Sequence, residues 1–303
     1  IYRKFYFIIK KMPKINFRNK VTIITGASQG LGFEIAKSFA KLGSNLVICA
    51  RNQHLLKKSL KKLKTYIGNK QKIIALKVDI SNQRDTLRLV KKTLREFKRI
   101  DILINNAGVL GPKGKVEEIN WKKWIRATEI NIFGSVLMCR AVLPYFKKVK
   151  RGKIIQLSGA GALNPMPMFS AYAASKAAIV RFSDTLAEEV KKYNIQVNSV
   201  AAGAINTKML KEIIRAGPKR VGSNFYKKIV LQKKTGGLPF KVVTELIIFL
   251  SSSKSKGITG KIISPKWDNW KNWSKNMNKI ISSDVYTLRR IKGIDRGYKW
   301  GDN

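Results

Sequence analysis

The stretch that decides the fold is residues 21–43, VTIITGASQGLGFEIAKSFAKLG. It begins with a short β-branched run, passes through a turn that contains Gly26, Gly30 and Gly32, and ends in the apolar periodicity of an amphipathic helix. Glycines in such a strand–turn–helix unit let a pyrophosphate approach backbone N–H groups, and the start of the helix supplies partial positive charge. We therefore expect a dinucleotide at this turn. The alternative is a glycine-rich turn without a ligand.

Further short apolar runs alternate with longer helical patterns along the chain. Including the first, they cover residues 21–24, 46–50, 73–78, 102–104, 154–157, 197–201 and 261–263. Continuous apolar runs are typical of strands buried on both faces, and the intervening helices supply the crossovers that parallel strands need. The pattern predicts a single α/β domain over residues 12–265, with a doubly wound parallel sheet of about seven strands and helices on both faces.

The two ends of the chain differ from this pattern. Residues 1–11 combine basic and aromatic side chains and are interpreted as an extension, with a weak membrane-surface anchor as the alternative. Residues 266–303 are predicted to be a basic extension whose regularly spaced Trp267, Trp270 and Trp273 favour a packed helix or an interface over a ligand cage. No stretch reaches the roughly 18–20 apolar residues that a membrane span needs.

The composition is strongly basic. The chain has 62 Lys and Arg against 17 Asp and Glu, a formal net charge of +45. Such a charge attracts polyanions without a specific site, but the basic residues are spread along the whole chain, which favours compositional bias on solvated faces. Cys49 and Cys139 form no disulfide framework, and a lone His54 in the loop after Arg51 leaves no histidine triad or zinc mechanism. We expect a cytoplasmic protein with no metal.

The residues that follow the second and third apolar runs bear on the nucleotide. Arg51 stands where a NAD-preferring site carries an acidic residue for the ribose 2′-OH. An arginine there can pair with the 2′-phosphate of NADP, assisted by Ser28, so NADP(H) is favoured and NAD is the alternative; a merely solvent-exposed arginine is also open. Asp79 is placed to bond the adenine amino group or to cap the next helix.

A set of motifs stands in the order and roughly at the spacing of one family. They are TGASQGLG at 25–32, NNAG at 105–108, Asn131 in EINIFGS, Ser158 in IIQLSGAG, and Tyr172 with Lys176 in YAASK. Over about residues 15–265 the chain resembles a short-chain dehydrogenase/reductase of the classical type. Its TGxxxGxG spacing counts against the extended sugar-nucleotide epimerases. The resemblance implies a Rossmann-type fold, a nicotinamide cofactor, a small carbonyl or alcohol substrate, and a homodimer or homotetramer.

Tyr172 and Lys176 form a candidate catalytic pair. They stand four residues apart in a helical pattern, so both side chains project from one face. A phenol with a pKa of about 10 exchanges protons poorly at neutral pH until a nearby cation stabilises the phenolate and lowers its pKa. We expect Lys176 to supply that cation, with Tyr172 as general acid and base. By resemblance, Lys176 also binds the nicotinamide ribose.

The resemblance implies further roles for Ser158 and Asn131. Ser158 is expected to hold the substrate oxygen, although most classical members place this serine one residue nearer to the tyrosine, where this chain has Gly159. Ser158 is chosen on the assumption that the following loop has one extra residue, and Ser170 is predicted to be the N-cap of the tyrosine helix. Asn131 is expected to support a water chain to the lysine; capping or kinking a helix is its alternative.

After the sixth run, NSVAAGAINTKM resembles the family's PGxxxT element, with Ala202 in place of proline. Its Gly203, Ile205 and Thr207 match the part that contacts the nicotinamide amide. Residues 208–238 occupy the position of the substrate lid; their many basic residues suit an anionic substrate or, as the alternative, only reflect the basic composition of the whole chain. The complete set of predicted cofactor-binding residues is Thr25, Gly26, Ser28, Gly30, Leu31, Gly32, Arg51, Asp79, Ile80, Asn106, Ala107, Gly108, Tyr172, Lys176, Gly203, Ile205 and Thr207.

Together the motifs predict an NAD(P)(H)-dependent oxidoreductase that transfers hydride between nicotinamide and a carbonyl or secondary alcohol. The alternative is a polyanion-binding or regulatory protein on the same scaffold, whose binding would weaken steeply with salt. The substrate stays open among a sugar, a steroid-like alcohol, a 3-oxoacyl thioester and a small ketone. An apolar patch beside the site is suggested by Met166, Met168, Phe169 and Met209.

Overall fold

A parallel sheet forms the centre of the computed structural model, which describes residues 15–299. Its seven strands follow the order β3-β2-β1-β4-β5-β6-β7, and each neighbouring pair is parallel. The strands are β1 (Val21–Thr25), β2 (Asn45–Ala50), β3 (Ile73–Lys77), β4 (Ile102–Asn105), β5 (Gly152–Ser158), β6 (Ile195–Ala201) and β7 (Ile262–Ile263). The predicted doubly wound sheet is confirmed. Its order reverses between β1 and β4, and doubly wound sheets bind ligands at the carboxyl ends of the strands beside such a reversal.

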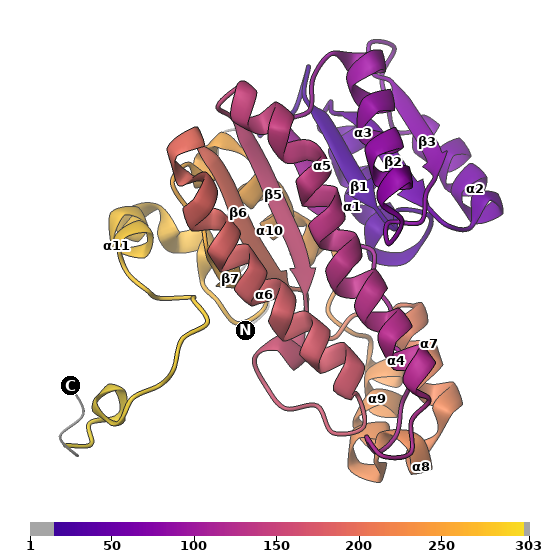
Figure 1. Cartoon of the computed structure of the whole chain (residues 1–303), viewed down its shortest axis with the longest axis vertical. Coiled ribbons are helices and arrows are strands. Elements are labelled where there is room, and N and C mark those ends of the chain that lie inside the picture. Colours follow the sequence, from indigo (N-terminus) through magenta and orange to yellow (C-terminus); the bar gives the residue numbers. More distant parts are fainter. Residues whose placement is uncertain (1–14, 300–303) are drawn as a thin grey trace.

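Helices cover both faces of the sheet (Figure 1). One layer contains α1 (Gly30–Lys41), α2 (Gln53–Lys64) and α10 (Phe240–Ser251); the other contains α3 (Gln83–Phe97), α5 (Gly134–Lys148) and α6 (Ser170–Val190). Each layer packs its apolar side chains on one face of the strands, so that every residue of β1 is buried. This two-sided burial is the reason that the strands are continuously apolar in sequence.

Shorter helices gather at the carboxyl end of the strands, where the β5 arrow points in Figure 1. They are α4 (Trp121–Thr128), the π-helical turn η3 (Glu129–Phe133), α7 (Lys208–Ala216), α8 (Pro218–Val221) and α9 (Ser223–Thr235). The last three form the region predicted as the substrate lid. Apolar side chains of α7, α8 and α9 join one cluster against which Tyr172 packs, so this region lies beside the predicted catalytic tyrosine.

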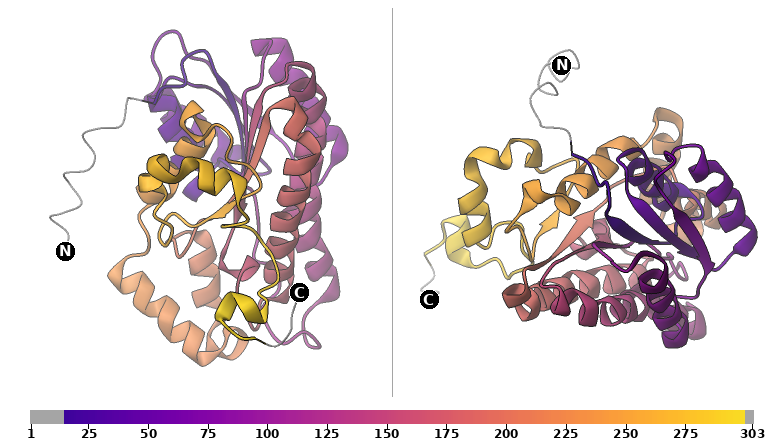
Figure 2. Two further views of the ribbon diagram at one scale, coloured as in Figure 1. Left: turned by 90° about the vertical axis from the view of Figure 1, so that its left-hand side faces the viewer. Right: turned by 90° about the horizontal axis from the view of Figure 1, so that it is seen from above.

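The first part of the segment after β7 packs against the core beside α10, and its last helical turn lies away from the sheet (Figure 1 and Figure 2). The helices of this segment are η7 (Trp270–Asn276), α11 (Met277–Ser282) and η8 (Gly293–Arg296). The Ile262 N–H donates to the Tyr286 carbonyl at 2.7 Å, which joins this segment to β7. Trp270 and Trp273 are buried, as expected for a packed helix, whereas Trp267 is exposed. Further 3-10 turns are η4 (Ala160–Ala162), η5 (Lys191–Tyr193) and η6 (Ser253–Ser255).

Two local predictions were wrong. The N-cap of α6 is Phe169, and Ser170 is already helical, with its hydroxyl accepting a hydrogen bond from the Trp124 indole at 3.2 Å. His54 lies in the first turn of α2 and not in the preceding loop, because Asn52 caps that helix through its side chain. The Ser170 contact joins residues far apart in the chain, whereas the Asn52 cap is a local signal that the sequence contains.

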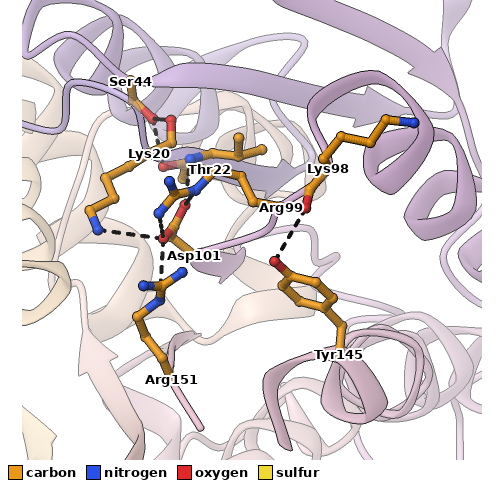
Figure 3. A network of polar contacts seen from close by, with 9 residues as sticks. Lys20, Thr22, Ser44, Lys98, Arg99, Asp101, Tyr145 and Arg151 are labelled. Carbon is orange, nitrogen blue, oxygen red and sulfur yellow. Dashed lines mark hydrogen bonds and ion pairs between the residues drawn. The ribbon is translucent and has the colours of Figure 1, made fainter. Parts of the chain in front are cut away.

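Asp101 ties together the amino ends of the central strands (Figure 3). Its carboxylate accepts a hydrogen bond from the Val21 N–H at 2.9 Å and pairs with Arg99 at 2.7 Å. Lys20 and Arg151 lie 3.6 and 3.7 Å from the same carboxylate. Because β1 and β4 begin here and end at the crevice, this network supports the sheet at the end opposite the predicted site.

The described residues also bear on membranes, thiols and metals. Within residues 15–299 no helix is long and apolar enough to cross a membrane; residues 1–11, for which a membrane-surface anchor was the alternative, lie outside this range. Cys49 and Cys139 are free and buried, and burial raises the pKa of each thiol to about 12. No group of three or more His, Cys, Asp or Glu in the described part of the chain could hold a metal ion.

Candidate active site

The glycine turn between β1 and α1 lies at the carboxyl end of the sheet, beside the reversal of its strand order, and its three glycines differ in what they contact. A Cβ at Gly26, whose φ is +66°, would lie 2.9 Å from the Cα of Ala107, and one at Gly32 would lie 2.4 Å from the Gly26 carbonyl oxygen. These two positions therefore need glycine for packing. At Gly30 a Cβ would meet only Thr207, with Cγ2 at 4.0 Å. Gly30 is therefore less closely packed than Gly26 and Gly32 and lies beside Thr207; both Gly30 and Thr207 are predicted to contact the cofactor.

The amino end of α1 is suited to an anion. Its N-cap, Gln29, makes no side-chain capping hydrogen bond, and the first turn contains no acidic residue. The first backbone N–H groups of the helix therefore have no side-chain partner, and the helix dipole favours negative charge at this end. This arrangement fits the pyrophosphate of a dinucleotide.

The NNAG loop is fastened to the glycine turn. The Thr25 hydroxyl accepts hydrogen bonds from the backbone N–H groups of Asn106 and Ala107, at 3.0 and 3.1 Å. The Asn106 side-chain amide donates back to the Thr25 carbonyl at 2.9 Å. Two segments far apart in the sequence are thereby joined, and the side chains of Thr25 and Asn106 make the hydrogen bonds between them.

Ser28 lies in the glycine turn after β1, and Arg51 follows the neighbouring strand β2. Arg51 is exposed directly after β2 and forms no ion pair within residues 15–299. The Ala27 N–H donates to the Cys49 carbonyl at 3.2 Å, which fixes the glycine turn against the end of β2. Ser28 and Arg51 therefore lie close to two backbone segments that are bonded to each other; their role toward a 2′-phosphate stays a prediction.

Asp79 is held by neighbours that the sequence did not suggest. Its carboxylate accepts hydrogen bonds from the Ser81 hydroxyl at 2.6 Å and from Arg126 at 2.5 Å. Burial alone would raise the pKa of Asp79, but the bonds from Ser81 and the charge of Arg126 hold that pKa below its ordinary value. The helix-cap alternative for Asp79 is wrong, because Asn82 caps α3. The adjacent Ile80 is buried.

Tyr172 and Lys176 lie together on α6. The Lys176 Nζ is 5.7 Å from the centre of the Tyr172 ring and donates to the Leu157 carbonyl at 2.7 Å. A Cβ on Gly108 would lie 3.4 Å from that Nζ, so the NNAG loop passes directly over the lysine. Since this loop also contacts the glycine turn, the predicted catalytic pair and the predicted dinucleotide cradle share one site.

Burial governs the ionisation of the pair. It raises the pKa of Tyr172 to about 12 and lowers the pKa of Lys176 to about 8. The direction for Tyr172 is opposite to the expected effect of the lysine, because the phenol is desolvated and Nζ is bonded to the Leu157 carbonyl. At neutral pH the tyrosine is therefore a protonated phenol, which can donate a proton.

Asn131 joins three parts of the site. It lies in the π-helical turn η3, and its side-chain amide donates to the Val109 carbonyl and to the Ser175 hydroxyl, both at 2.9 Å. Its side-chain oxygen accepts from the Val109 N–H at 2.8 Å. The irregular helix considered as an alternative is present, and the side chain holds the NNAG loop against α6. The water chain to Lys176 stays a prediction.

Ser158 and Gly159, at the end of β5, lie beside different parts of α6. The Ser158 hydroxyl donates to the Lys176 backbone carbonyl at 3.4 Å. A Cβ on Gly159 would lie 2.6 Å from the Tyr172 hydroxyl oxygen. The residue beside the phenol oxygen is thus Gly159, and the substrate-holding role of Ser158 stays a prediction.

The predicted apolar patch is present beside Tyr172. All four of its members belong to the cluster formed with the lid: Met166, Met168, Phe169 and Met209. In the loop after β6, Gly203 has a φ of +78° and is exposed, while Ile205 packs against the core shared by α1, α2 and α10. A substrate at the phenol would therefore meet a largely apolar wall under a basic lid.

Comparisons with known proteins agree with this geometry. The family model described as short chain dehydrogenase matches residues 20–217. The 3-oxoacyl-[acyl-carrier-protein] reductase FabG of Chlamydia muridarum is 32% identical over 246 residues, covering 81% of this chain and 95% of the relative. Dehydrogenase/reductase SDR family member 7B of Mus musculus is 31% identical over 224 residues, covering 74% and 69%.

Solved structures show the same fold. NAD+-bound xylitol dehydrogenase superposes with a TM-score of 0.75 at 24% identity, covering 82% of this chain and 98% of that one. Levodione reductase also gives a TM-score of 0.75, at 23% identity, covering 82% and 96%. With the family match over residues 20–217, the motifs and the contacts among them lead to one conclusion: the chain belongs to the classical short-chain dehydrogenase/reductase family of NAD(P)-dependent oxidoreductases.

Proposed function

We propose that the protein is an NADP(H)-dependent oxidoreductase that interconverts a carbonyl and a secondary alcohol, with Tyr172 as the general acid and base. The observation that carries the proposal is the position of Lys176 Nζ. It lies 5.7 Å from the centre of the Tyr172 ring and next to Gly108. Gly108 belongs to the NNAG loop, which is also hydrogen-bonded to the glycine turn. The proton donor Tyr172, the cation Lys176 and the proposed nucleotide-binding loops thus lie next to one another.

Each group has a distinct task in reduction. The nicotinamide, when bound, supplies the hydride. Tyr172 donates its phenolic proton to the substrate oxygen, and the Lys176 ammonium stabilises the phenolate that remains. Asn131 holds the end of the NNAG loop next to α6, because its side-chain amide donates to the Val109 carbonyl and to the Ser175 hydroxyl. In the oxidative direction Tyr172 takes the proton back.

The preference for NADP(H) rests on Arg51. We expect Arg51→Ala to raise the Kd for NADPH at least about tenfold, because a charge-assisted bond contributes roughly 1.5–3 kcal/mol. The Kd for NADH should change less than about twofold, since NADH has no 2′-phosphate for Arg51 to bind. Fluorescence titration of both nucleotides measures the two constants. Arg95→Ala, an exposed arginine in the last turn of α3, is the control; equal losses for NADPH and NADH would contradict the assignment.

The substrate proposal is a 3-oxoacyl thioester. The Chlamydia relative is named for such a substrate on an acyl carrier protein, and this chain offers an apolar wall at Tyr172 beneath a basic lid. The test is NADPH oxidation, followed by absorbance, with a 3-oxoacyl thioester, a steroid ketone, a keto sugar and a small ketone. We expect the thioester to react fastest. Absence of NADPH oxidation with every compound would contradict the proposed activity.

A polyanion-binding role stays a second proposal, and α2 is the surface that favours it. Five exposed lysines lie on this helix: Lys57, Lys58, Lys61, Lys62 and Lys64. None of them forms an ion pair within residues 15–299, and α2 contains no acidic residue. Such a face attracts phosphates by charge alone, so its binding would fall steeply as salt is raised.

A further inference from the structure

We propose that Arg126 positions the Asp79 carboxylate and thereby makes the adenine end of the nucleotide site selective for a 6-amino purine. The inference rests on the proposed function, because it concerns the nucleotide that the oxidoreductase binds. It assigns a positioning role to an arginine on α4, outside the glycine turn and the NNAG loop.

The first support is the set of hydrogen bonds around the Asp79 carboxylate. Oδ1 accepts from the Ser81 N–H at 3.0 Å and from the Ser81 hydroxyl at 2.6 Å, while Oδ2 accepts from Arg126 Nη2 at 2.5 Å. An ionised carboxylate accepts about four hydrogen bonds, two on each oxygen. Within residues 15–299 one position therefore remains, and it lies on the oxygen that Arg126 contacts. The direction of this last acceptor thus depends on Arg126.

The second support is that Arg126 is itself fixed in orientation. Its Nη1 donates to the Ser81 hydroxyl and to Glu129 Oε2, both at 2.8 Å. Because the guanidinium is planar, two partners on Nη1 also fix the direction of Nη2. The Ser81 hydroxyl accepts from Arg126 and donates to Asp79, so the arginine, the serine and the carboxylate form one closed network.

The third support is the charge of Asp79. Burial alone would raise its pKa, but the bonds from Ser81 and the charge of Arg126 hold that pKa below its ordinary value. An ionised carboxylate can only accept hydrogen bonds. Adenine presents an amino donor at C6, whereas hypoxanthine presents a carbonyl oxygen there. The ionised Asp79 therefore favours adenine and repels the 6-oxo base.

A separate contact holds the backbone of this loop in place. A Cβ on Gly134 would lie 2.6 Å from Ile80 Cδ1, so the loop after β3 packs directly on the start of α5. Arg126 and Gly134 lie on either side of Asn131 in one continuous helical segment. Because Ile80 anchors the loop without Arg126, removal of the guanidinium tests the direction of the carboxylate and leaves the loop docked.

The experiment compares two nucleotides by fluorescence titration: NADPH, and its analogue in which hypoxanthine replaces adenine. The wild type should bind NADPH at least about tenfold more tightly than the analogue, because a hydrogen bond to a charged group contributes about that factor or more. Arg126→Met should raise the NADPH Kd about fivefold or more and change the Kd of the analogue less than about twofold. Arg140→Met, at an exposed arginine of α5, is the control and should change neither constant.

A double-mutant cycle tests whether Arg126 acts through Asp79. In the Asp79→Ala background, Arg126→Met should raise the NADPH Kd no further, because the carboxylate that Arg126 directs is gone. Arg126→Lys is the second variant, for use if the methionine variant folds poorly. Its ammonium keeps the charge without the fork of the guanidinium, so it should show a smaller loss that is again confined to NADPH.

The outcomes separate this inference from the proposed function. Equal losses for NADPH and the analogue in Arg126→Met, or additive effects in the cycle, would overturn the role of Arg126. A wild type without preference for NADPH over the analogue would overturn it as well. If the wild type shows that preference and loses it in Arg126→Met but oxidises NADPH with no substrate, the proposed activity fails and the role of Arg126 stands.

Discussion

Tyr172→Phe is expected to abolish turnover, lowering kcat by about 10³-fold or more, while NADPH binding is largely preserved. The substitution removes the only group on this side chain that can donate a proton, and general acid catalysis contributes about 10²–10⁴-fold. The ring itself stays, so its packing against the lid cluster is preserved. Stopped-flow or steady-state NADPH oxidation measures kcat, and fluorescence titration measures the Kd.

Tyr193→Phe is the matched control. Tyr193 lies in η5 beyond the end of α6, where its ring contacts Lys147 and Lys192. Its hydroxyl has no part in the proposed chemistry, so kcat should stay within about twofold of wild type. Retained turnover in Tyr172→Phe would refute the assignment of the general acid. A parallel loss in Tyr193→Phe would indicate a general structural effect.

Lys176→Met should lower kcat by about 10²-fold or more, because the phenolate left by proton transfer loses its cation. The wild-type pH profile carries the same information. Burial lowers the pKa of Lys176 to about 8, so the ammonium is present below pH 8 and is lost above it. The rate of reduction should be level below about pH 8 and then fall tenfold per pH unit. Tyr172 remains protonated through this range, because its pKa is about 12.

The Lys176→Met profile should lack this decline, since no ammonium remains to titrate. Lys191→Met, at an exposed lysine paired with Glu188, serves as the control and should keep the wild-type profile. A wild-type rate that rises through pH 8, or a decline that persists in Lys176→Met, would show that another group governs reduction.

Much of the fold could be predicted from local patterns in the sequence. The seven apolar runs correspond to β1 through β7, with boundaries displaced by one or two residues. The glycines at 26, 30 and 32 correctly marked the turn between β1 and α1. These features depend on residues close in the chain, where hydrophobic periodicity and glycine spacing act directly. The Ser170 cap failed because a distant indole, that of Trp124, bonds the serine hydroxyl.

The site was predictable as a set of residues and unpredictable in its contacts. The pairing of Asp79 with Arg126 joins residues from separate parts of the chain, and no motif suggested it. The spacing from the tyrosine drew attention to Gly159 but could not show that it touches the phenol oxygen. Likewise, a helical spacing placed Lys176 near Tyr172 without revealing how strongly burial governs both pKa values.

The sequence alone determined the doubly wound sheet, the family, and the residues from which a site could be built, because each of these is written in short-range periodicity and spacing. Tertiary structure decided which groups face one another: Gly108 over Lys176, Gly159 against Tyr172, and Ser158 turned toward the α6 backbone. The physical reason is that hydrogen bonds and desolvation act over a few ångströms in space. Separation along the chain does not specify those distances until the helices pack on the sheet.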